Sequence, residues 1–168
     1  MCRDGQSRDA EWAILTSMNR ESAPLSAQDL RRLTARDIMT AAPLTVEPGT
    51  KLSKAAQLME ERGIQHFPVV AGGRLVSLLG ERHLRDAMPS VLTVEDPEAR
   101  RQYLNVTRVE QVAPKNAPTV ELDTPLAEII TLMRRHRLDG VAVAEDGRLA
   151  GIVTSGDLIT LLERVLRS

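Results

Sequence analysis

A threonine and an aspartate three positions apart form the strongest candidate for ligand chemistry in this chain. Thr154 ends the apolar run Gly151-Ile152-Val153, and Asp157 lies one turn into the helix that we expect to follow. A hydroxyl and free backbone N–H groups at the start of a helix favour a bound phosphate. The Asp157 carboxylate can accept hydrogen bonds from both vicinal hydroxyls of a ribose. The pair therefore indicates a nucleotide or nucleoside ligand.

The same Thr-x-x-Asp spacing also describes a capping box. In that arrangement the two side chains satisfy N–H groups at the helix start and bind no ligand. The position of the pair after a strand, inside an internal repeat, favours ligand contact, while the capping interpretation stays open.

The repeat relates two stretches of the chain by a constant shift of 74 residues. Thr45-Val46-Glu47 recurs as Thr119-Val120-Glu121, and Gly73-Arg74-Leu75 recurs as Gly147-Arg148-Leu149. Two copies of this length are too few and too long for a solenoid, so a duplicated small domain fits better. Because a unit of roughly 60 residues buries little surface alone, we expect the copies to share a core.

The first copy differs from the second at the candidate site. The shift places Gly80 opposite Thr154 and His83 opposite Asp157, so the hydroxyl and the carboxylate are both missing. A neutral imidazole can accept one hydrogen bond but cannot bind a diol as a carboxylate does. We expect this first site to be altered or empty. Three side chains are left as candidates for weaker binding there: His66, Arg82 and His83.

The sequence shows no set of residues suited to metal binding or catalysis. The histidines His66, His83 and His136 are far apart in sequence and show no zinc-site spacing. No glycine-rich phosphate loop, nucleophile elbow or acid/base pair is visible. We therefore expect neither a metal site nor an enzyme. The alternative is a metal protein or enzyme that uses His66, His83 and Glu81.

Each copy is predicted to run strand, helix, strand, strand, helix. In the first copy a short strand at Leu44–Val46 precedes a helix that ends near Gly63, and Gly72-Gly73 is a two-residue hairpin turn. In the second copy Pro125 marks a helix start, Asp146-Gly147 marks the hairpin, and a last helix from Ser155 to Leu166 carries a broad apolar face. This order predicts an α/β (α+β) fold with two β-α-β-β-α repeats related by pseudo-twofold symmetry.

The repeat also divides the chain into segments. We expect an N-terminal helical extension (1–33), a first repeat (34–88), a linker (89–108) and a second repeat (109–168). Helices are predicted around Trp12–Met18 and from Ser26 to Leu33 in the extension. A further helical stretch is predicted over Pro97–Leu104 in the linker.

Composition indicates a cytoplasmic protein with an aliphatic core. Aromatic residues make up only 2% of the chain, so Leu, Ile, Val, Ala and Met must fill the interior. A net charge of −1 argues against binding to nucleic acid or to an anionic membrane surface, because both need clustered positive charge. The single Cys2 excludes an intramolecular disulfide. The N-terminal residues lack an apolar signal segment, and no run of about 18 apolar residues occurs.

Three motifs resemble a tandem CBS-domain module, named for cystathionine beta-synthase. They are Gly140-Val141-Ala142-Val143, the stretch from Gly151 to Leu158, and Phe67-Pro68-Val69-Val70. The resemblance covers residues 34–168. The Ala87–Ser90 stretch and the long linker also look like small bacterial two-repeat proteins of the acetoin-utilisation type.

The resemblance implies roles for particular residues. In the family, the matching threonine and aspartate contact phosphate and ribose, while the first and middle strands flank the base. The implied ligand-binding residues are Thr154, Asp157, Thr119, Val120, Gly140, Val141 and Ala142. The corresponding weaker site consists of Thr45, Val46, His66, Phe67, Pro68, Arg82 and His83.

These observations predict a non-catalytic regulatory module that senses an adenosine-containing ligand in a cleft between the repeats. No cofactor is expected to be required, and AMP, ADP, ATP or S-adenosylmethionine are possible ligands. Because no arginine lies beside Asp157, a monophosphate or an uncharged adenosyl compound is favoured over a triphosphate. We expect a homodimer held by apolar helices and an unknown downstream protein partner. The alternative is a dimerisation or scaffold module whose sites have decayed.

Overall fold

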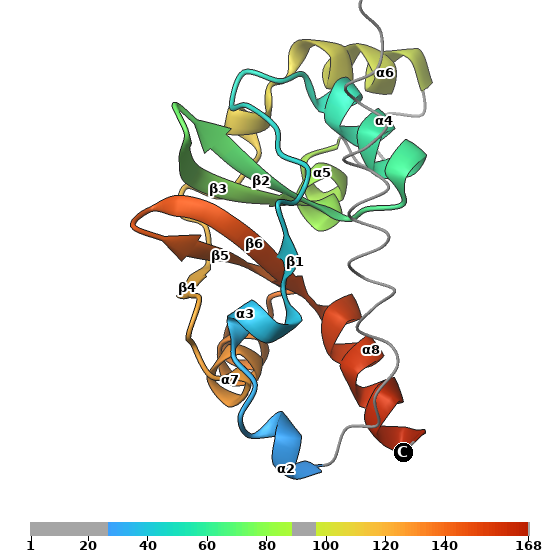
Figure 1. The fold of residues 1–168 in the computed structure, drawn as a ribbon. Helices are drawn as coiled ribbons and strands as arrows, with labels where there is room; N and C mark the ends of the chain where they lie inside the picture. Colours follow the sequence, from blue (N-terminus) through green and yellow to red (C-terminus); the bar gives the residue numbers. More distant parts are fainter. Residues whose placement is uncertain (1–26, 89–96, 168) are drawn as a thin grey trace, which may run out of the picture.

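The structure is a computed structural model that describes residues 27–88 and 97–167. The helix predicted around Trp12–Met18 lies outside the described residues. Two small sheets lie side by side at the centre of the molecule, with α4 and α6 beyond one sheet and α7 beyond the other (Figure 1). The predicted α/β fold with two repeats is confirmed.

The first repeat follows the predicted order of elements, with one short helix on either side of residue 33. Up to residue 88 the elements are α2 (Ala27–Leu30), α3 (Ala35–Ile38), β1 (Thr40–Ala41), α4 (Leu52–Arg62), β2 (His66–Ala71), β3 (Arg74–Gly80) and α5 (Glu81–Ala87). The strand predicted at Leu44–Val46 is reduced to a single parallel bridge between Val46 and Val69. The helix predicted from Ser26 to Leu33 is limited to α2.

The second repeat is preceded by a helix in the linker, as predicted. From residue 97 the elements are α6 (Pro97–Val106), a 3₁₀ turn η1 (Val109–Gln111), β4 (Thr119–Glu121), α7 (Leu126–His136), β5 (Gly140–Glu145), β6 (Arg148–Thr154) and α8 (Ser155–Leu166). Both hairpins turn through residues with positive φ, at Gly72 and Gly73 and at Asp146 and Gly147. Such φ values are what a two-residue hairpin turn requires.

The two sheets are built on the same plan but differ in extent. The second repeat holds a four-stranded sheet in the order β1-β6-β5-β4, in which β4 runs parallel to β5 and the other pairs are antiparallel. The first repeat holds the hairpin β2-β3, with His66 opposite Gly80. The register of β5 and β6 places Gly140 opposite Thr154. The two candidate junctions therefore lie at equivalent ends of the two hairpins.

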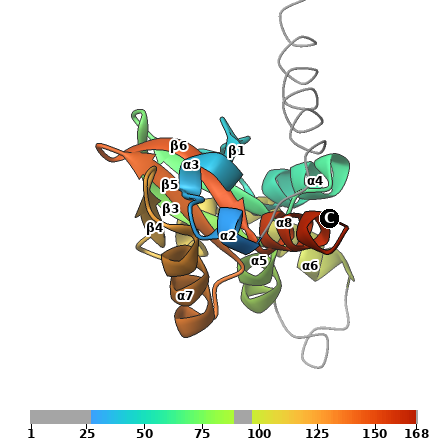
Figure 2. The same cartoon turned by 60° about the horizontal axis from the view of Figure 1, so that its bottom comes forward.

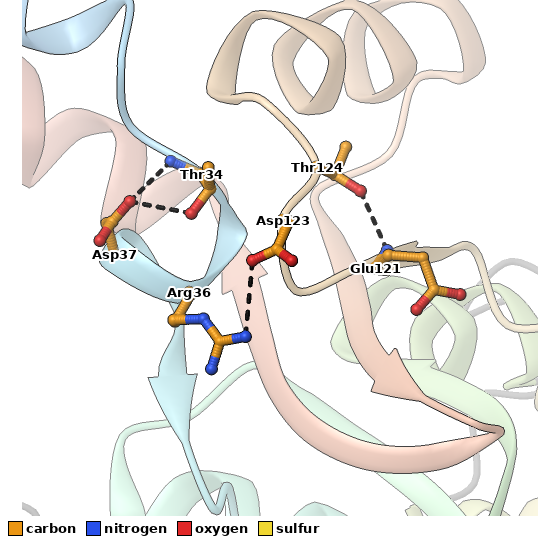
Figure 3. A network of polar contacts seen from close by, with 6 residues as sticks. All are labelled: Thr34, Arg36, Asp37, Glu121, Asp123 and Thr124. Carbon is orange, nitrogen blue, oxygen red and sulfur yellow. Dashed lines mark hydrogen bonds and ion pairs between the residues drawn. The ribbon is translucent and has the colours of Figure 1, made fainter.

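The first residues of each repeat pack on the other repeat. Backbone N–H groups of Ala35 and Arg36 donate to the carbonyls of Thr124 and Leu122, and β1 pairs with β6. Figure 3 shows this contact, where the Arg36 guanidinium lies 3.4 Å from the Asp123 carboxylate. The start of the first repeat is thus held by the second.

In the same way, the residues that follow α6 form hydrogen bonds with the first repeat. The N–H of Leu52 donates to the carbonyl of Thr107, and the N–H of Val109 donates to the carbonyl of Thr50. Arg108 adds a side-chain hydrogen bond of 2.7 Å to the carbonyl of Gly49. Neither repeat therefore completes its own hydrogen bonds within its own sequence.

The interior divides into two apolar clusters that follow this exchange. The first cluster is built from α4, β2 and β3 and includes Val109, while Tyr103 and Leu104 of α6 pack against it. The second is built from β4, α7, β5 and β6 and includes Ala35 from α3. Burial of one Leu, Ile or Val side chain contributes about 1.5–3 kcal/mol, so these exchanged residues stabilise the opposite repeat.

Helices α5 and α8 leave their strands on the same side of the molecule (Figures 1 and 2). The apolar face predicted for the last helix is largely uncovered, since Ile159, Leu162 and Leu166 are 66%, 55% and 77% exposed. Within the described ranges, no helix has the length and apolar character that crossing a membrane requires.

Candidate functional site

A cavity of about 680 Å³ opens between the two repeats where β3 passes into α5. The first repeat contributes the end of β3 and the first turns of α5. The second repeat contributes the segment before β4 and the turn from α7 into β5. This volume lies within the range of small-molecule sites, roughly 300–1,000 Å³. The side chains that give the lining its chemistry are His66, Arg82, His83, Asp86, Asn116, Thr119, His136, Arg137 and Asp139, beside Leu78, Leu132 and Leu138.

The His66 imidazole packs between two glycines, one from each repeat. A Cβ atom on Gly80 would lie 3.2 Å from Cδ2 of His66, and a Cβ atom on Gly140 would lie 3.4 Å from the same atom. Glycine at both positions therefore leaves the space that the ring occupies. Because the shift of 74 residues aligns His66 with Gly140, a side chain of one repeat fills the place left empty by the other.

His83 closes the start of α5 and is held in one tautomer. Its Nδ1 accepts a hydrogen bond of 3.0 Å from the backbone N–H of Gly80. A ring nitrogen that accepts must be unprotonated, so the neutral imidazole carries its proton on Nε2. His83 thereby performs the helix-capping role that a carboxylate usually has at this position.

Burial keeps both imidazoles neutral. It lowers the pKa of His66, and it is the largest influence there, ahead of the carboxylates of Asp139 and Asp157, which raise this pKa. Burial also lowers the pKa of His83, with Asp86 raising it and Arg82 lowering it further. Neutral histidines suit a site that accepts or donates hydrogen bonds without charge.

The charged side chains of the cavity balance. Arg82 and Arg137 supply two positive charges, and Asp86 and Asp139 supply two negative charges. Arg82 Nε lies 3.6 Å from the Asp86 carboxylate on the exposed face of α5. These four side chains together carry no net formal charge, so the cavity does not favour a ligand with several negative charges.

Arg137 occupies an unusual backbone position. It ends α7 with φ 53° and ψ 45°, whereas the equivalent position at the end of α4 is Gly63 with φ 61°. A left-handed conformation costs a residue with a Cβ atom roughly 1–2 kcal/mol, a cost that glycine avoids. The residue that bears this cost lines the cavity, which is the pattern expected where a side chain has a function.

Thr154 and Asp157 form the capping box that their spacing allowed. One carboxylate oxygen of Asp157, Oδ2, accepts from the backbone N–H and from the hydroxyl of Thr154, both at 2.7 Å. The unrelated pair Thr34 and Asp37 makes the same two bonds at 2.8 Å before the four-residue helix α3. The motif by itself is therefore not specific to a ligand site.

Neither Thr154 nor Asp157 lines the cavity. The cavity joins the β3–α5 junction of the first repeat to residues 116–119 of the second. The shift of 74 residues maps that segment onto residues 42–45, so the repeat predicts that the Thr154 junction faces the first repeat. The expectation that Thr154 and Asp157 share one ligand site with the strands of the second repeat stays a prediction.

The remaining predicted residues divide between cavity and core. Thr119 and Gly140 line the cavity together with His66, Arg82 and His83, so the structure brings together members of both predicted sets. Thr45 is exposed. The other predicted residues are buried in the sheets: Val46, Phe67, Pro68, Val120, Val141 and Ala142.

Sequence reasoning missed Asp86, Asn116 and Asp139. The available signal was the segment from Pro114 to Pro118, whose two prolines frame a stretch before the predicted strand. Nothing in the sequence indicates that this segment of the second repeat lies against the β3–α5 junction of the first repeat. In the part of the chain that is described, no group of three or more His, Cys, Asp or Glu side chains has a metal-binding arrangement.

Comparison with known proteins places both repeats in one family. The CBS domain matches residues 35–90 and 109–164. A CBS domain-containing protein of Dictyostelium discoideum is 31% identical over 137 residues, which cover 80% of this chain and 94% of that protein.

Two solved structures have the same fold. A Vibrio cholerae protein assigned to acetoin utilization has a TM-score of 0.66 at 24% identity, over 80% of this chain and 93% of its own, and supports the fold alone. A CBS domain pair solved in complex with 5′-methylthioadenosine and S-adenosyl-L-methionine has a TM-score of 0.64 at 25% identity, over 78% of this chain and 96% of its own.

Proposed function

The chain belongs to the CBS-domain family, and from this premise we propose that it is a non-catalytic regulatory module that senses an adenosine-containing ligand between its two repeats. The observation that carries the proposal is the cavity, because both repeats line it. A ligand held there contacts both, so its affinity depends on how the repeats are placed. A downstream protein partner would read that placement.

The ligand class rests on the relative and on the charge balance of the cavity. The solved CBS pair with bound 5′-methylthioadenosine and S-adenosyl-L-methionine supports an adenosine-containing compound. A lining with two positive and two negative side chains favours an AMP-like monophosphate or an uncharged adenosyl compound over ATP. We infer that Thr119, Gly140, His66 and His83 contact the nucleoside, and that Arg82 and Arg137 lie near any anionic group.

Binding of AMP, ADP, ATP, S-adenosylmethionine and 5′-methylthioadenosine to the purified chain tests this proposal. Isothermal titration calorimetry should give saturable heat for at least one compound, and Arg82→Ala should weaken the binding of AMP by about tenfold, the loss of one charge-assisted contact. Arg36→Ala is the matched control, because Arg36 is also an exposed arginine paired with an aspartate but lies on α3.

Two outcomes would change the proposal. If none of the five compounds binds, the sensor function is wrong and the scaffold alternative replaces it. If binding survives Arg82→Ala and is lost in Asp157→Ala, the ligand lies at the junction of Thr154 and Asp157 instead of in the cavity.

The uncovered face of α8 favours self-association as a second function. Ile159, Leu162 and Leu166 lie on one side of the helix at spacings of three and four residues and are more than half exposed. We propose that a second copy of the chain covers this face. Light scattering should report a dimer for the native chain and a monomer for Leu162→Glu, while Val76→Glu, an exposed position on β3, should leave the dimer intact.

A further inference from the structure

We propose that His66 and His83 make the cavity a proton-linked site for anionic adenosine compounds: the two imidazoles take up protons when an anionic group binds. This inference rests on the proposed function, because it concerns the ligand of the same cavity. Its consequence is that affinity for an anionic ligand rises as the pH falls, while affinity for the uncharged nucleoside does not.

The two rings lie around one glycine. A Cβ atom on Gly80 would be 3.3 Å from Nε2 of His66 and 3.6 Å from Nδ1 of His83. Both side chains are half-buried and both line the cavity. A charge placed on either ring is therefore close to the other ring and to any ligand in the cavity.

His83 couples protonation to the start of α5. In the neutral state its Nδ1 accepts the Gly80 N–H at 3.0 Å. A proton on Nδ1 would turn that nitrogen into a donor facing another donor, so the bond is lost on protonation. An anionic ligand group compensates, because it can accept from the protonated ring.

His66 is surrounded by ionisable groups from every element around it. Asp139 lies in the turn before β5, Glu81 and His83 belong to α5, and Asp157 belongs to α8. The three carboxylates raise its pKa, yet burial outweighs them and keeps the pKa below its ordinary value. Around His83 the charged groups are Asp86 and Arg82 on its own helix and Asp139 from the second repeat.

The sign of the linkage follows from these states. Without ligand, both pKa values lie below the ordinary histidine value of about 6.5, so both rings are neutral at pH 7.5. A bound anion favours the protonated rings and raises both pKa values in the complex. Between the pKa values of the complex and those of the free protein, binding takes up protons and the affinity rises as pH falls.

Adenosine 5′-sulfate and adenosine are the probes for this linkage, because a sulfate monoester stays singly charged across the range tested. For the native chain, calorimetry from about pH 7.5 to about pH 5.5 should show at least a fivefold gain in affinity for adenosine 5′-sulfate. Each proton taken up contributes at most about tenfold per pH unit. Adenosine should change less than twofold. Titrations in buffers of different ionisation enthalpy should show proton uptake with the sulfate only.

The variants His66→Gln and His83→Asn remove the titrating groups and keep their polarity. Asparagine at position 83 retains an acceptor for the Gly80 N–H, so the helix start is preserved. The double variant should bind adenosine 5′-sulfate with less than a twofold change over the same pH range. His136 is the third imidazole that lines the cavity, so His136→Gln is measured beside the double variant, and the pH dependence should remain in it if His66 and His83 carry the linkage. Circular dichroism would verify that each variant folds.

The outcomes separate the two proposals. If neither probe nor any of the five compounds tested above binds the native chain, the adenosine-sensing function itself is wrong. If one of those five binds and neither probe does, the function stands and the proton linkage is overturned. If both probes bind and the sulfate affinity is flat with pH, or if the pH dependence survives in the double variant or vanishes in His136→Gln, the function stands and the proton linkage is overturned.

Discussion

The β3–α5 and β6–α8 junctions solve the same structural problem with different chemistry. In both, the third helical residue accepts a hydrogen bond from the backbone N–H of the residue that ends the strand: His83 from Gly80, and Asp157 from Thr154. An imidazole accepts once and loses this ability on protonation, whereas a carboxylate accepts twice and also binds the Thr154 hydroxyl. The first junction therefore loses its capping bond when His83 is protonated, a change that the burial-lowered pKa of His83 shifts to lower pH, and the second is closed by its own side chains.

The strands that lead into the junctions differ in a matching way. Ser77 of β3 donates its hydroxyl to the carbonyl of Pro114, the neighbouring segment of the second repeat. At the equivalent position of β6, Gly151 leaves room for Met39 and for the carbonyl of Thr40 in β1. One junction is flanked by a segment outside the sheet and a cavity, and the other by a paired strand. The difference indicates that duplicated repeats can diverge at the site while the surrounding hydrogen bonds stay.

Gly151→Ala should cause the largest loss of stability, because it adds a methyl group where β6 packs closely against Met39 and β1. This close packing distinguishes β6 from β3. The new Cβ atom would lie 2.5 Å from the sulfur of Met39 and 2.9 Å from the carbonyl oxygen of Thr40. Forcing a methyl group into such a space costs about 1–3 kcal/mol. Chemical denaturation would measure the loss of unfolding free energy. Ser77→Ala should cost less, about 1 kcal/mol for one hydrogen bond, and equal losses at both positions would contradict the comparison.

Asp157→Ala should come next. It removes the acceptor of two hydrogen bonds at the start of a twelve-residue helix, and loss of a cap of this kind costs about 0.5–2 kcal/mol. Asp37→Ala removes the same pair of bonds from a four-residue helix and is the matched control. Urea unfolding of both variants would show whether the longer helix depends more on its cap. A larger loss for Asp37→Ala would reverse the order.

Arg137→Gly should stabilise the fold and weaken the binding of the ligand. Glycine relieves the left-handed conformation at the end of α7 and should raise the free energy of unfolding by roughly 1 kcal/mol. The reciprocal change Gly63→Arg at the end of α4 should lower it by a similar amount. Thermal denaturation measures both, and AMP binding separates them, since only Arg137 lines the cavity. A destabilised Arg137→Gly protein would contradict the strain argument.

The pH dependence of stability should show the smallest effect. Burial lowers the pKa of His66 and His83 in the folded chain, so the unfolded chain binds more protons below the ordinary value of about 6.5. Stability is therefore full above that pH and falls as pH decreases toward the lowered values. Both rings keep partial contact with solvent, which screens the effect to below about 1 kcal/mol. Denaturation at several pH values should show a shallower fall for the His66→Gln, His83→Asn double variant, and parallel curves would contradict the assignment.

Local patterns in the sequence predicted the repeats well, because each of them reports short-range chemistry. The Gly72-Gly73 and Asp146-Gly147 turns and the helix after Pro125 occur as expected, and the linker helix predicted over Pro97–Leu104 is observed over Pro97–Val106. These features depend on backbone preference and apolar period within a few residues of each other.

Pairings between distant segments were beyond sequence reasoning. A constant shift aligns residue 45 with residue 119, but it does not tell which junction either segment faces. Each segment could face the junction of its own repeat or that of the other repeat, and both arrangements bury equivalent apolar side chains. The apolar period of the sequence therefore does not distinguish them. For this reason β1 was not expected, the strand at Leu44–Val46 was predicted longer than its single bridge, and the cavity combined residues that we had assigned to separate sites.

The exchange of leading segments constrains how this molecule folds. A polypeptide ending at residue 88 would lack Val109, Tyr103 and Leu104 from its interior, and one beginning at residue 97 would lack Ala35 and β1. We therefore expect unfolding to be a single cooperative transition, with no stable half. A single copy would need a second polypeptide to donate the missing arm. The tandem arrangement supplies both arms within one covalent molecule, so the two junctions need not share one sequence.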